Sequence, residues 1–515
     1  MLGIQAIVFF AFLSSCFAAK FAMFPMPFGR SHVLFVSKLG QELAERGHEV
    51  KIHTGGSSRS FAESSPYVRF FNDTKCSLEV KETSSQPVIE TNPKKALALL
   101  YTVQSCFCDE MLGDSELMNE VSRADLVVGE FIYLCSALVA DQLSLPHVLI
   151  SAFSLNHPMA LAVGLPLSPT YVAHSSVPLN DQSSFMDRAK YIFFWVFSYL
   201  SYRQDLCASF GDVKSTHNIT PEKSIQETLG RVDMIISQVP FGFGLENPRP
   251  LPPNARVVGP FLPGPPKPLP DELEQFMQRS GDEGVILVSF GSVMGDVVGV
   301  DESVWQMMAE AFAKVPQKVI WKLKLDGTSR ISLSENVKLL SWLPQNDILG
   351  HHKTRLFIAH AGINGILEST YHGVPMICSP FFGDQFLNAQ MAQQGGFAEA
   401  IDLKTLSSQE FVDLIHKVIN QASYRESAER ISKSVKLLPR PPVKEAADWV
   451  EYAQAQGSLE FLKPLGSDLP FYELYCLDIL LLAFSLLVLV IFLINSFFKV
   501  VRKSVSRFNG KHKTQ

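Results

Sequence analysis

The chain repeats one pattern of apolar and polar residues in each of its two halves. Residues 20–26 are apolar, as in a strand, and a short turn leads into a helical pattern that ends near Gly47. Residues 284–290 and 305–314 repeat this order in the second half. Strand, loop, helix and strand form the unit of a parallel sheet. The sequence therefore predicts an α/β protein with two doubly wound, Rossmann-like domains that face each other.

Further strands are predicted where short apolar runs lie between helical stretches. They are expected through Val50 and Ile52 and at residues 126–128, 147–151, 234–237, 318–323, 337–340, 356–359 and 376–379. In open parallel sheets, ligands bind beyond the carboxyl ends of the strands. We therefore expect the functional residues in the loops that follow these strands, between the two domains.

A proline-rich segment separates the halves. Residues 248–270 contain ten of the 31 prolines in the chain. Because proline cannot donate a backbone hydrogen bond, this stretch is predicted to be extended. We assign residues 19–247 to the first domain, 248–282 to the linker and 283–460 to the second domain.

The two ends of the chain predict the compartment. Residues 1–18 are apolar and too short to span a bilayer, so they are interpreted as a signal peptide. A first buried strand or helix is the alternative, because the stretch has no Lys or Arg at its start. Residues 479–498 have the length and apolarity of a transmembrane helix. The mean hydropathy of +0.13 reflects these two segments.

The charges around the predicted span give its orientation. Residues 461–478, before the span, include acidic side chains, whereas residues 499–515 carry six Lys and Arg and no acid. The positive-inside rule places this tail in the cytosol and the body across the membrane. The spacing Lys511-x-Lys513-x-x resembles a retrieval signal of the endoplasmic reticulum, although a stop-transfer flank has the same composition. We expect a single-pass type I protein of that membrane. The net charge of −6 argues against nucleic-acid binding.

A lumenal body would be open to glycosylation and disulfide formation. Asn72 and Asn218 begin Asn-x-Thr sequons and are the predicted glycosylation sites. Apart from Cys16 in the predicted signal peptide and Cys476 at the membrane edge, the six remaining cysteines have no metal-site spacing. Some of them are expected to pair, but the sequence does not give their connectivity.

The strongest concentration of chemistry lies in residues 342–385. His360 follows the apolar run 356–359, and the turn Gly362-Ile363-Asn364-Gly365 leads into a helix that contains Glu368. Free backbone N–H groups at such a helix start can bind phosphate, and glycine allows close approach. A glycine-rich turn alone has a purely structural role just as often.

This segment resembles the signature of the UDP-glycosyltransferases, which are membrane-bound, inverting enzymes that use nucleotide sugars. A weaker likeness extends over nearly the whole chain. It includes residues 246–250, residues 288–292 and the C-terminal anchor. The Phe-Gly-Asp-Gln sequence at 382–385 looks closest to the third vertebrate subfamily and the ceramide galactosyltransferases. The resemblance implies two facing domains of the GT-B type. The sequence shows no metal-binding cluster, and helix N-termini could supply the charge neutralisation, so no metal or other cofactor beyond the UDP-sugar co-substrate is predicted.

The resemblance also implies a role for each residue of the UDP-sugar site. Trp342 would stack on uracil, with Gln345 at the nucleoside and Glu368 on the ribose hydroxyls. The diphosphate would be held by His360, Gly362, Asn364 and the backbones of Gly365 and Ser292. The sugar hydroxyls would bind Asp384 and Gln385. A core tryptophan and a helix-capping aspartate are the alternatives for Trp342 and Asp384. Ala361 departs from the family glycine, and we expect its methyl group to require a negative φ or slight crowding.

In the first half, His32 follows the first strand and is predicted to be the catalytic base. A neutral imidazole suits proton abstraction near neutral pH, and a carboxylate on its other nitrogen would orient it. Asp125 and Glu130 are the candidate carboxylates, before and after the strand 126–128. Only Glu130 lies at the carboxyl end, so it is preferred. A solvated loop acid is the alternative for Glu130.

The predicted function is inverting transfer of a hexosyl group, glucose-like or glucuronic acid, from a UDP-sugar to a hydroxyl group of a small lipophilic acceptor. A sphingolipid hexosyltransferase and an inactive UDP-sugar-binding membrane protein are the alternatives. The aromatic stretch 191–200 could line an acceptor pocket or enter the bilayer surface, or could simply be core. The expected partners are the UDP-sugar, an alcohol, phenol or lipid acceptor and the membrane. A homo-oligomer is possible.

Overall fold

The computed structural model describes residues 18–27, 29–63, 65–77, 93–155, 159–166, 184–242, 244–291, 302–324, 331–381 and 383–511. It contains two compact units, Met1–Leu462 and Lys463–Gln515. The predicted signal peptide, except for its last residue, and the predicted diphosphate contact Ser292 lie outside the described residues.

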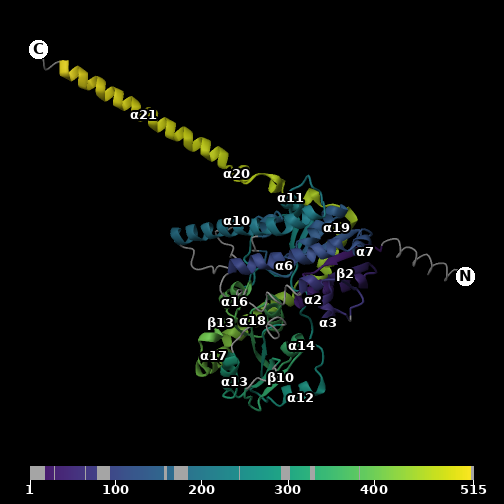
Figure 1. Ribbon diagram of the computed structural model, residues 1–515. Coiled ribbons are helices and arrows are strands. Elements are labelled where there is room, and N and C mark those ends of the chain that lie inside the picture. The colour runs from purple at the N-terminus through teal and green to yellow at the C-terminus, as the bar shows by residue number, and fades with distance from the viewer. Residues whose placement is uncertain are drawn as a thin grey trace. The chain divides into compact units, whose positions relative to one another are not determined.

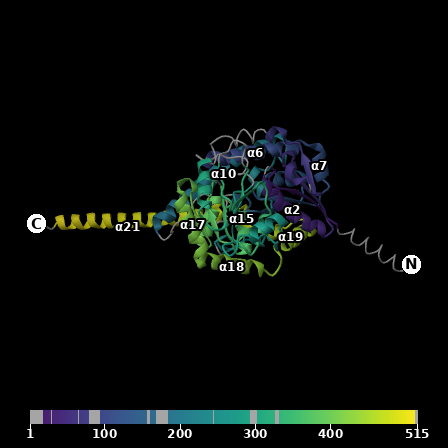
Figure 2. The same ribbon diagram turned by 90° about the horizontal axis from the view of Figure 1, so that it is seen from below.

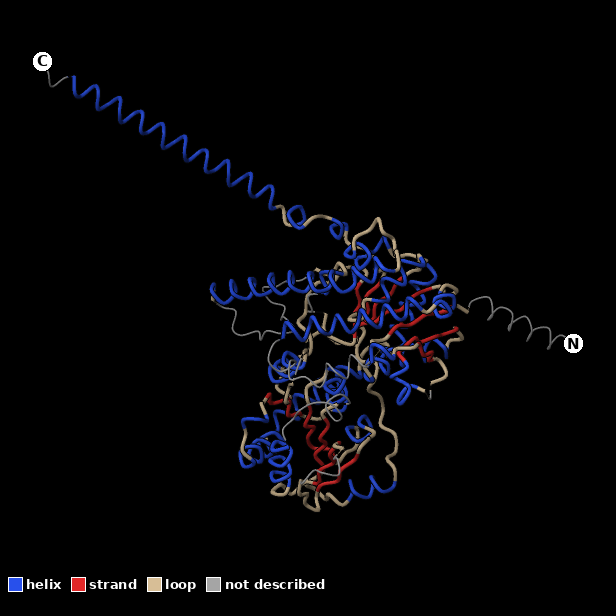
Figure 3. The backbone as a smooth tube through the Cα atoms, in the orientation of Figure 1, coloured by secondary structure: helices blue, strands red, loops and turns tan. Residues whose placement is uncertain are grey.

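The larger unit contains two parallel sheets, which Figure 3 shows as two separate groups of strands. The first has the order β3-β2-β1-β4-β5-β6-β7. Its strands are β1 (Lys20–Phe24), β2 (Glu49–Gly55), β3 (Val68–Phe71), β4 (Leu126–Glu130), β5 (His147–Ser151), β6 (Met234–Ser237) and β7 (Ala255–Val257). The second has the order β10-β9-β8-β11-β12-β13. Its strands are β8 (Val285–Ser289), β9 (Lys318–Lys322), β10 (Val337–Leu340), β11 (Thr354–Ala359), β12 (Met376–Cys378) and β13 (Ala398–Ala400).

Helices connect the strands of both sheets. Those that follow strands of the first sheet are α2 (Arg30–Glu45), η1 (Gly56–Ser58), α3 (Arg59–Ala62), α6 (Pro93–Gly113), α7 (Ser115–Val121), α8 (Cys135–Leu143), α9 (Met159–Ala162), α10 (Phe185–Thr216), α11 (Ile225–Gly230) and α12 (Asp271–Gln278). Those that follow strands of the second are α13 (Glu302–Phe312), α14 (Gln345–Leu349), α15 (Ile363–His372), α16 (Gln385–Gln394), η2 (Leu403–Thr405), α17 (Ser408–Asn420), α18 (Ala422–Lys436), α19 (Pro442–Gln456) and η3 (Glu460–Leu462).

The central strands are buried on both faces. Every residue of β4 and of β8 is buried. Runs such as Val285-Ile286-Leu287-Val288 suit this position, because parallel sheets carry helices on both sides and so need apolar residues throughout. The predicted α/β architecture with two doubly wound sheets is confirmed, and each strand expected from the sequence is present within a few residues.

The proline-rich linker contains one strand and one helix. Residues 255–257 form β7, which pairs in parallel with β6 at the sheet edge, and α12 lies before β8. The segment 254–259 contains no proline, so its N–H groups can join the sheet; the N–H of Val258 donates to the carbonyl of Ser237 at 3.0 Å. The stretch predicted to be extended, residues 248–270, thus contributes a strand to the first sheet, and α12 lies in the remainder of the linker, residues 271–282.

Helix α19 returns from the second half to the first. It belongs to the range 283–460 predicted for the second domain, yet it packs on α2, as Figure 2 shows, and on β6. Arg46, directly after α2, donates from Nη1 to Asp448 and to Glu451, both at 2.8 Å. The first half is thus completed by residues from the end of the larger unit.

Two disulfides join α6 to its surroundings. Cys106 pairs with Cys76, and Cys108 pairs with Cys135 at the start of α8. Among the described residues, Cys207, Cys378 and Cys476 are free.

Helix α10 lies along α6 (Figure 1) and has two different faces in the stretch 191–200. Tyr191 and Trp195 are buried in the core, whereas Phe193 and Phe197 are exposed. The prediction of ordinary core is therefore correct for one face only.

The smaller unit contains η4 (Leu465–Asp468), α20 (Phe471–Leu474) and α21 (Leu477–Lys511). Residues Leu477–Val505 of α21 are long and apolar enough to cross a membrane, and none of the most apolar window is buried. This helix includes the predicted span 479–498 and fits a C-terminal membrane anchor.

Candidate active site at the carboxyl ends of the strands

The predicted site residues follow the carboxyl ends of strands in both sheets. His32 lies in the first turn of α2, after β1, and Glu130 is the last residue of β4. In the second half, His360 directly follows β11, and Asp384 lies between β12 and α16. The carboxyl edges of the two sheets are in contact. The side chain of Gln238, which follows β6 in the first sheet, donates a hydrogen bond to the side chain of Asn364 in α15, which follows β11 in the second.

His32 and Glu130 form a hydrogen-bonded pair. Nδ1 of His32 bonds to Oε1 of Glu130, and Oε2 of Glu130 accepts the backbone N–H of Met26 at 2.9 Å. The Glu130 side chain is completely buried, and the His32 side chain is 12% exposed. A carboxylate only accepts hydrogen bonds, so Nδ1 carries the proton and Nε2 keeps its lone pair. The structure therefore excludes a solvated loop position for Glu130.

The other candidate carboxylate lies at the opposite end of β4. Asp125 accepts the backbone N–H of Lys20, at the start of β1, at 2.8 Å. That contact places it at the amino edge of the sheet. Of the two acids, only Glu130 lies at the carboxyl end of β4, as its position after the strand predicted.

Charges from both halves act on His32. Its burial alone would lower the pKa, but the charge and hydrogen bond of Glu130 and the charge of Asp384 together raise the pKa above 6.5. Burial raises the pKa of Asp384 to about 6, against the bond from Asn388 and the charge of His32. The charge of Asp384, in the second half, thus acts on the predicted base in the first.

The ring of His360 lies between two glycines. A Cβ atom on Gly291 would come within 2.8 Å of the ring, and one on Gly362 within 2.6 Å. Neither glycine could therefore be replaced by a larger residue without displacing this histidine. Burial and the nearby charge of Lys322 lower the pKa of His360 to about 4, so the ring is neutral at physiological pH.

Ala361 adopts the left-handed conformation that usually favours glycine. Its φ is +61° and its side chain is fully buried. The expected negative φ at Ala361 was therefore wrong. The left-handed conformation of an alanine is strained. Nδ2 of Asn388 donates to the Ala361 carbonyl at 3.1 Å and to Asp384 at 2.6 Å, so it holds the turn and the acid together.

The predicted nucleoside contacts cluster around α14 and α15. Nε2 of Gln345 donates to Oε2 of Glu368. Burial raises the pKa of Glu368 to about 7, although the bond from Gln345 opposes the shift. The Trp342 side chain lies before α14 and is 58% exposed, so it is not a core residue and offers an open face for a base.

The predicted sugar contacts differ in accessibility. Asp384 occupies the N-cap position of α16, but its side chain makes no capping hydrogen bond. Gln385 is buried, and its Oε1 accepts the N–H of Phe381 at 2.9 Å. Asp384 is thus the more accessible of the two, and the capping alternative does not describe it.

Sequence reasoning missed two polar residues of this region. Lys322 ends β9 and donates from Nζ to the carbonyl of Gly291 at 2.9 Å, beside His360. Asn388 connects Asp384 with the Ala361 turn. The only sequence signal for Lys322 was its place directly after the buried run Val319-Ile320-Trp321. Asn388 had the signal of lying one helical turn after Asp384.

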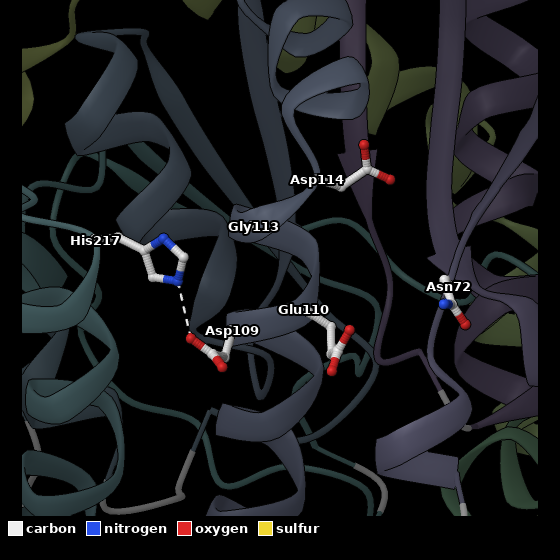
Figure 4. Close-up of a pocket in the computed structure, with 6 residues that line it drawn as sticks. All are labelled: Asn72, Asp109, Glu110, Gly113, Asp114 and His217. Carbon is white, nitrogen blue, oxygen red and sulfur yellow. Dashed lines mark hydrogen bonds and ion pairs between the residues drawn. The ribbon is translucent and has the colours of Figure 1, made fainter.

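A separate pocket of about 370 Å³, drawn in Figure 4, is lined by none of these residues. His217 contacts Asp109 there at 2.9 Å, and the other lining residues are Asn72, Glu110, Gly113 and Asp114. Both predicted glycosylation sites, Asn72 and Asn218, are exposed. Within the described part of the chain, no group of three or more His, Cys, Asp or Glu is placed to hold a metal ion.

The chain matches a known protein family over nearly its whole length. The family model described as UDP-glucoronosyl and UDP-glucosyl transferase matches residues 20–514. The chain belongs to this family. One curated relative is UDP-glucuronosyltransferase 2B7 of Homo sapiens. The two are 30% identical over 503 residues, which cover 92% of this chain and 93% of the relative. UDP-glucuronosyltransferase 2B9 of Macaca fascicularis is 32% identical over 498 residues, with 92% of each chain covered.

Solved structures show the same fold at lower sequence identity. The calicheamicin glycosyltransferase aligns with a TM-score of 0.59 and 19% identity, over 85% of this chain and 99% of that one. A UDP-glucose:anthocyanidin 3-O-glucosyltransferase in complex with UDP aligns with a TM-score of 0.56 and 18% identity, with the same coverage. The fold is that of the GT-B glycosyltransferases. This member of the UDP-glucoronosyl and UDP-glucosyl transferase family is therefore an enzyme that transfers sugars from UDP-sugars.

Proposed function

We propose that the enzyme transfers a hexosyl group from a UDP-sugar to a hydroxyl group of a small lipophilic acceptor, with inversion at the anomeric carbon. The His32–Glu130 pair carries this proposal. It leaves Nε2 of His32 as a lone-pair base, and the charge of Asp384, the predicted sugar-binding acid, acts on the same imidazole, which supports the proposal.

The reaction is a direct displacement. Nε2 of His32 takes the acceptor proton while the acceptor oxygen forms a bond to the anomeric carbon. The bond from that carbon to the diphosphate breaks, and UDP leaves with the electron pair. The Glu130 carboxylate stabilises the imidazolium that results, and an α-linked donor gives a β-glycoside.

Groups of the second half would stabilise the departing UDP. The first-turn N–H groups of α15 and the ammonium of Lys322 are suited to the diphosphate charge. Trp342 and the Gln345–Glu368 pair would hold the nucleoside. We propose that these groups suffice without a metal ion, so a chelator should leave the transfer rate unchanged.

The donor is proposed to be a neutral hexose such as glucose, with glucuronic acid as the alternative. Glucuronate requires a cation near its carboxylate, and the residues expected at the sugar, Asp384 and Gln385, supply none. The names of the curated relatives favour glucuronic acid. A panel of UDP-sugars, offered with phenols and ceramide and analysed by mass spectrometry, would identify both substrates. Transfer to ceramide alone would favour the sphingolipid enzyme, and no transfer from any donor would refute the proposal.

We further propose that the body lies in the lumen of the endoplasmic reticulum, with the tail in the cytosol. Two disulfides and two exposed sequons support an oxidising, glycosylating compartment. Protease treatment of sealed microsomes should remove only the tail, and endoglycosidase should shift the mass of the protected body. Digestion of the body without detergent would contradict this orientation.

A further inference from the structure

The side chain of Gln238 joins the two halves at the candidate active site. It follows β6 in the first sheet and is completely buried. Its Oε1 accepts the N–H of Phe261 at 3.2 Å, and its Nε2 donates to the carbonyl of Ala152 at 3.0 Å and to Oδ1 of Asn364 at 2.8 Å. The amide therefore uses both donors and one acceptor.

The backbone decides which way this amide faces. A backbone N–H can only donate, so the N–H of Phe261 requires the oxygen of Gln238 on its side. A backbone carbonyl can only accept, so Ala152 requires the nitrogen on the other side. The second N–H of Gln238 then faces Asn364, which must present its oxygen to it.

The orientation of Asn364 follows from that of Gln238. With Oδ1 held, the NH₂ group is the part of the Asn364 side chain that remains for a ligand, and among the described residues it makes no other hydrogen bond. Asn364 is the second residue of α15, where backbone N–H groups also lack helical partners. A donor amide beside these N–H groups suits an anion.

We propose that Gln238 is a positioning residue that fixes the Asn364 amide so that it donates to the diphosphate of the UDP-sugar. This role rests on the proposed function, in which α15 receives the diphosphate. An asparagine amide has two orientations of similar intrinsic energy. In the wrong one, Oδ1 would face the phosphate oxygens and repel them. Gln238 removes that orientation before the ligand arrives.

The test compares UDP with uridine, which lacks the phosphates, as ligands of the full-length protein in detergent. Gln238→Met keeps the side-chain length but cannot donate to Asn364. We expect it to weaken UDP binding roughly tenfold, as for the loss of a hydrogen bond to a charged group, and to leave uridine affinity unchanged. Gln317→Met is the matched control, because Gln317 is also buried but bonds to Glu283. It should change neither affinity.

A double variant separates positioning from a general structural effect. If Gln238 acts through Asn364, Gln238→Met should not reduce UDP affinity further in an Asn364→Ala background. Should Gln238→Met not fold, Gln238→Glu is the second variant, because burial favours its protonated form. That form keeps an acceptor for Phe261 and donates its O–H to Ala152, and the hydroxyl oxygen then accepts from the Asn364 amide. We expect this to turn the Asn364 amide around, with the same selective loss of UDP binding.

Each other outcome has a distinct meaning. Equal losses of UDP and uridine binding, no loss, or an additive loss in the double variant would overturn the positioning role while the proposed function stands. Failure of the unmodified protein to bind UDP would overturn the proposed function itself, and with it the role of Gln238.

Discussion

One carboxylate oxygen of Glu130 holds Nδ1 of His32, and its other oxygen accepts a backbone N–H, so both are occupied before any substrate binds. Their hydrogen bond joins the first turn of α2, which follows β1, to the carboxyl end of the neighbouring strand β4. The imidazole is therefore oriented by the fold, with its proton on Nδ1 and its lone pair on Nε2. This arrangement leads to predictions on the base, its pH dependence, the nucleoside site and the backbone of the phosphate turn.

Replacing the base should separate catalysis from binding. His32→Ala is expected to lower kcat roughly 10²- to 10⁴-fold, the usual contribution of a general base, while UDP affinity is retained. Steady-state rates and UDP titration measure the two quantities. His217→Ala is the control, because His217 pairs with Asp109 outside the site and its loss should not change kcat. Equal turnover by His32→Ala and the unmodified enzyme would exclude His32 as the base.

The pH profile should report the charge of Glu130. The base must be neutral to act, so kcat/KM falls as pH falls through the pKa of His32, which lies above 6.5. Glu130→Gln removes the charge that raises this pKa. We expect the acid limb to move to lower pH and the plateau to fall by roughly one to two orders of magnitude, because the imidazolium loses its partner.

Asp125→Asn provides a matched control for that profile. Asp125 lies just before the amino end of the same strand and bonds to the backbone of Lys20. Its profile should match that of the unmodified enzyme. An acid limb that stays in place in Glu130→Gln, or moves in Asp125→Asn, would contradict the pairing.

Trp342 should contribute binding energy without contributing stability. Trp342→Ala is expected to weaken binding of both UDP and uridine about tenfold or more, since stacking of one base is worth about 1–3 kcal/mol. Trp342→Phe should retain most of the affinity. The Tm should not change, because the side chain is 58% exposed. Trp449→Ala, which removes a ring packed on Arg256, is the control; a loss of UDP binding there as well would make the effect of Trp342 non-specific.

Ala361 should tolerate glycine and reject β-branched residues. Ala361→Gly relieves about 1 kcal/mol of left-handed strain and loses a similar amount through backbone entropy, so its Tm should remain close to that of the unmodified protein. Ala361→Val is expected to lose about 1–3 kcal/mol of unfolding free energy and also UDP affinity. Ala389→Gly, inside α16, lacks the relief and should lose about 1 kcal/mol. A valine variant with unchanged Tm would contradict the backbone geometry.

The sequence was sufficient for the parts of the fold that depend on local pattern. Apolar runs located the strands except β3, β7 and β13, which are short and were not predicted. The place of Glu130 after its strand distinguished it from Asp125. His360 and Asp384 lie at the same edge of the second sheet because they follow the neighbouring strands β11 and β12. The role of Gln238 was not predictable, since it depends on three partners between 23 and 126 positions away. The packing of α19 on α2 was hidden for the same reason, because periodicity shows that a helix has an apolar face but not what covers it.

The return of α19 also sets the order in which the protein can be completed during synthesis. Ala446, Ala447, Val450 and Ala453 share a hydrophobic cluster with Val36 and Leu39 of α2. Helix α2 leaves the ribosome early, but α19, which packs on α2 and β6, is not complete until residue 456. The nascent first half therefore exposes the strip that α19 will cover while the second half is being made. A premature stop anywhere between the two sheets would leave that strip exposed permanently.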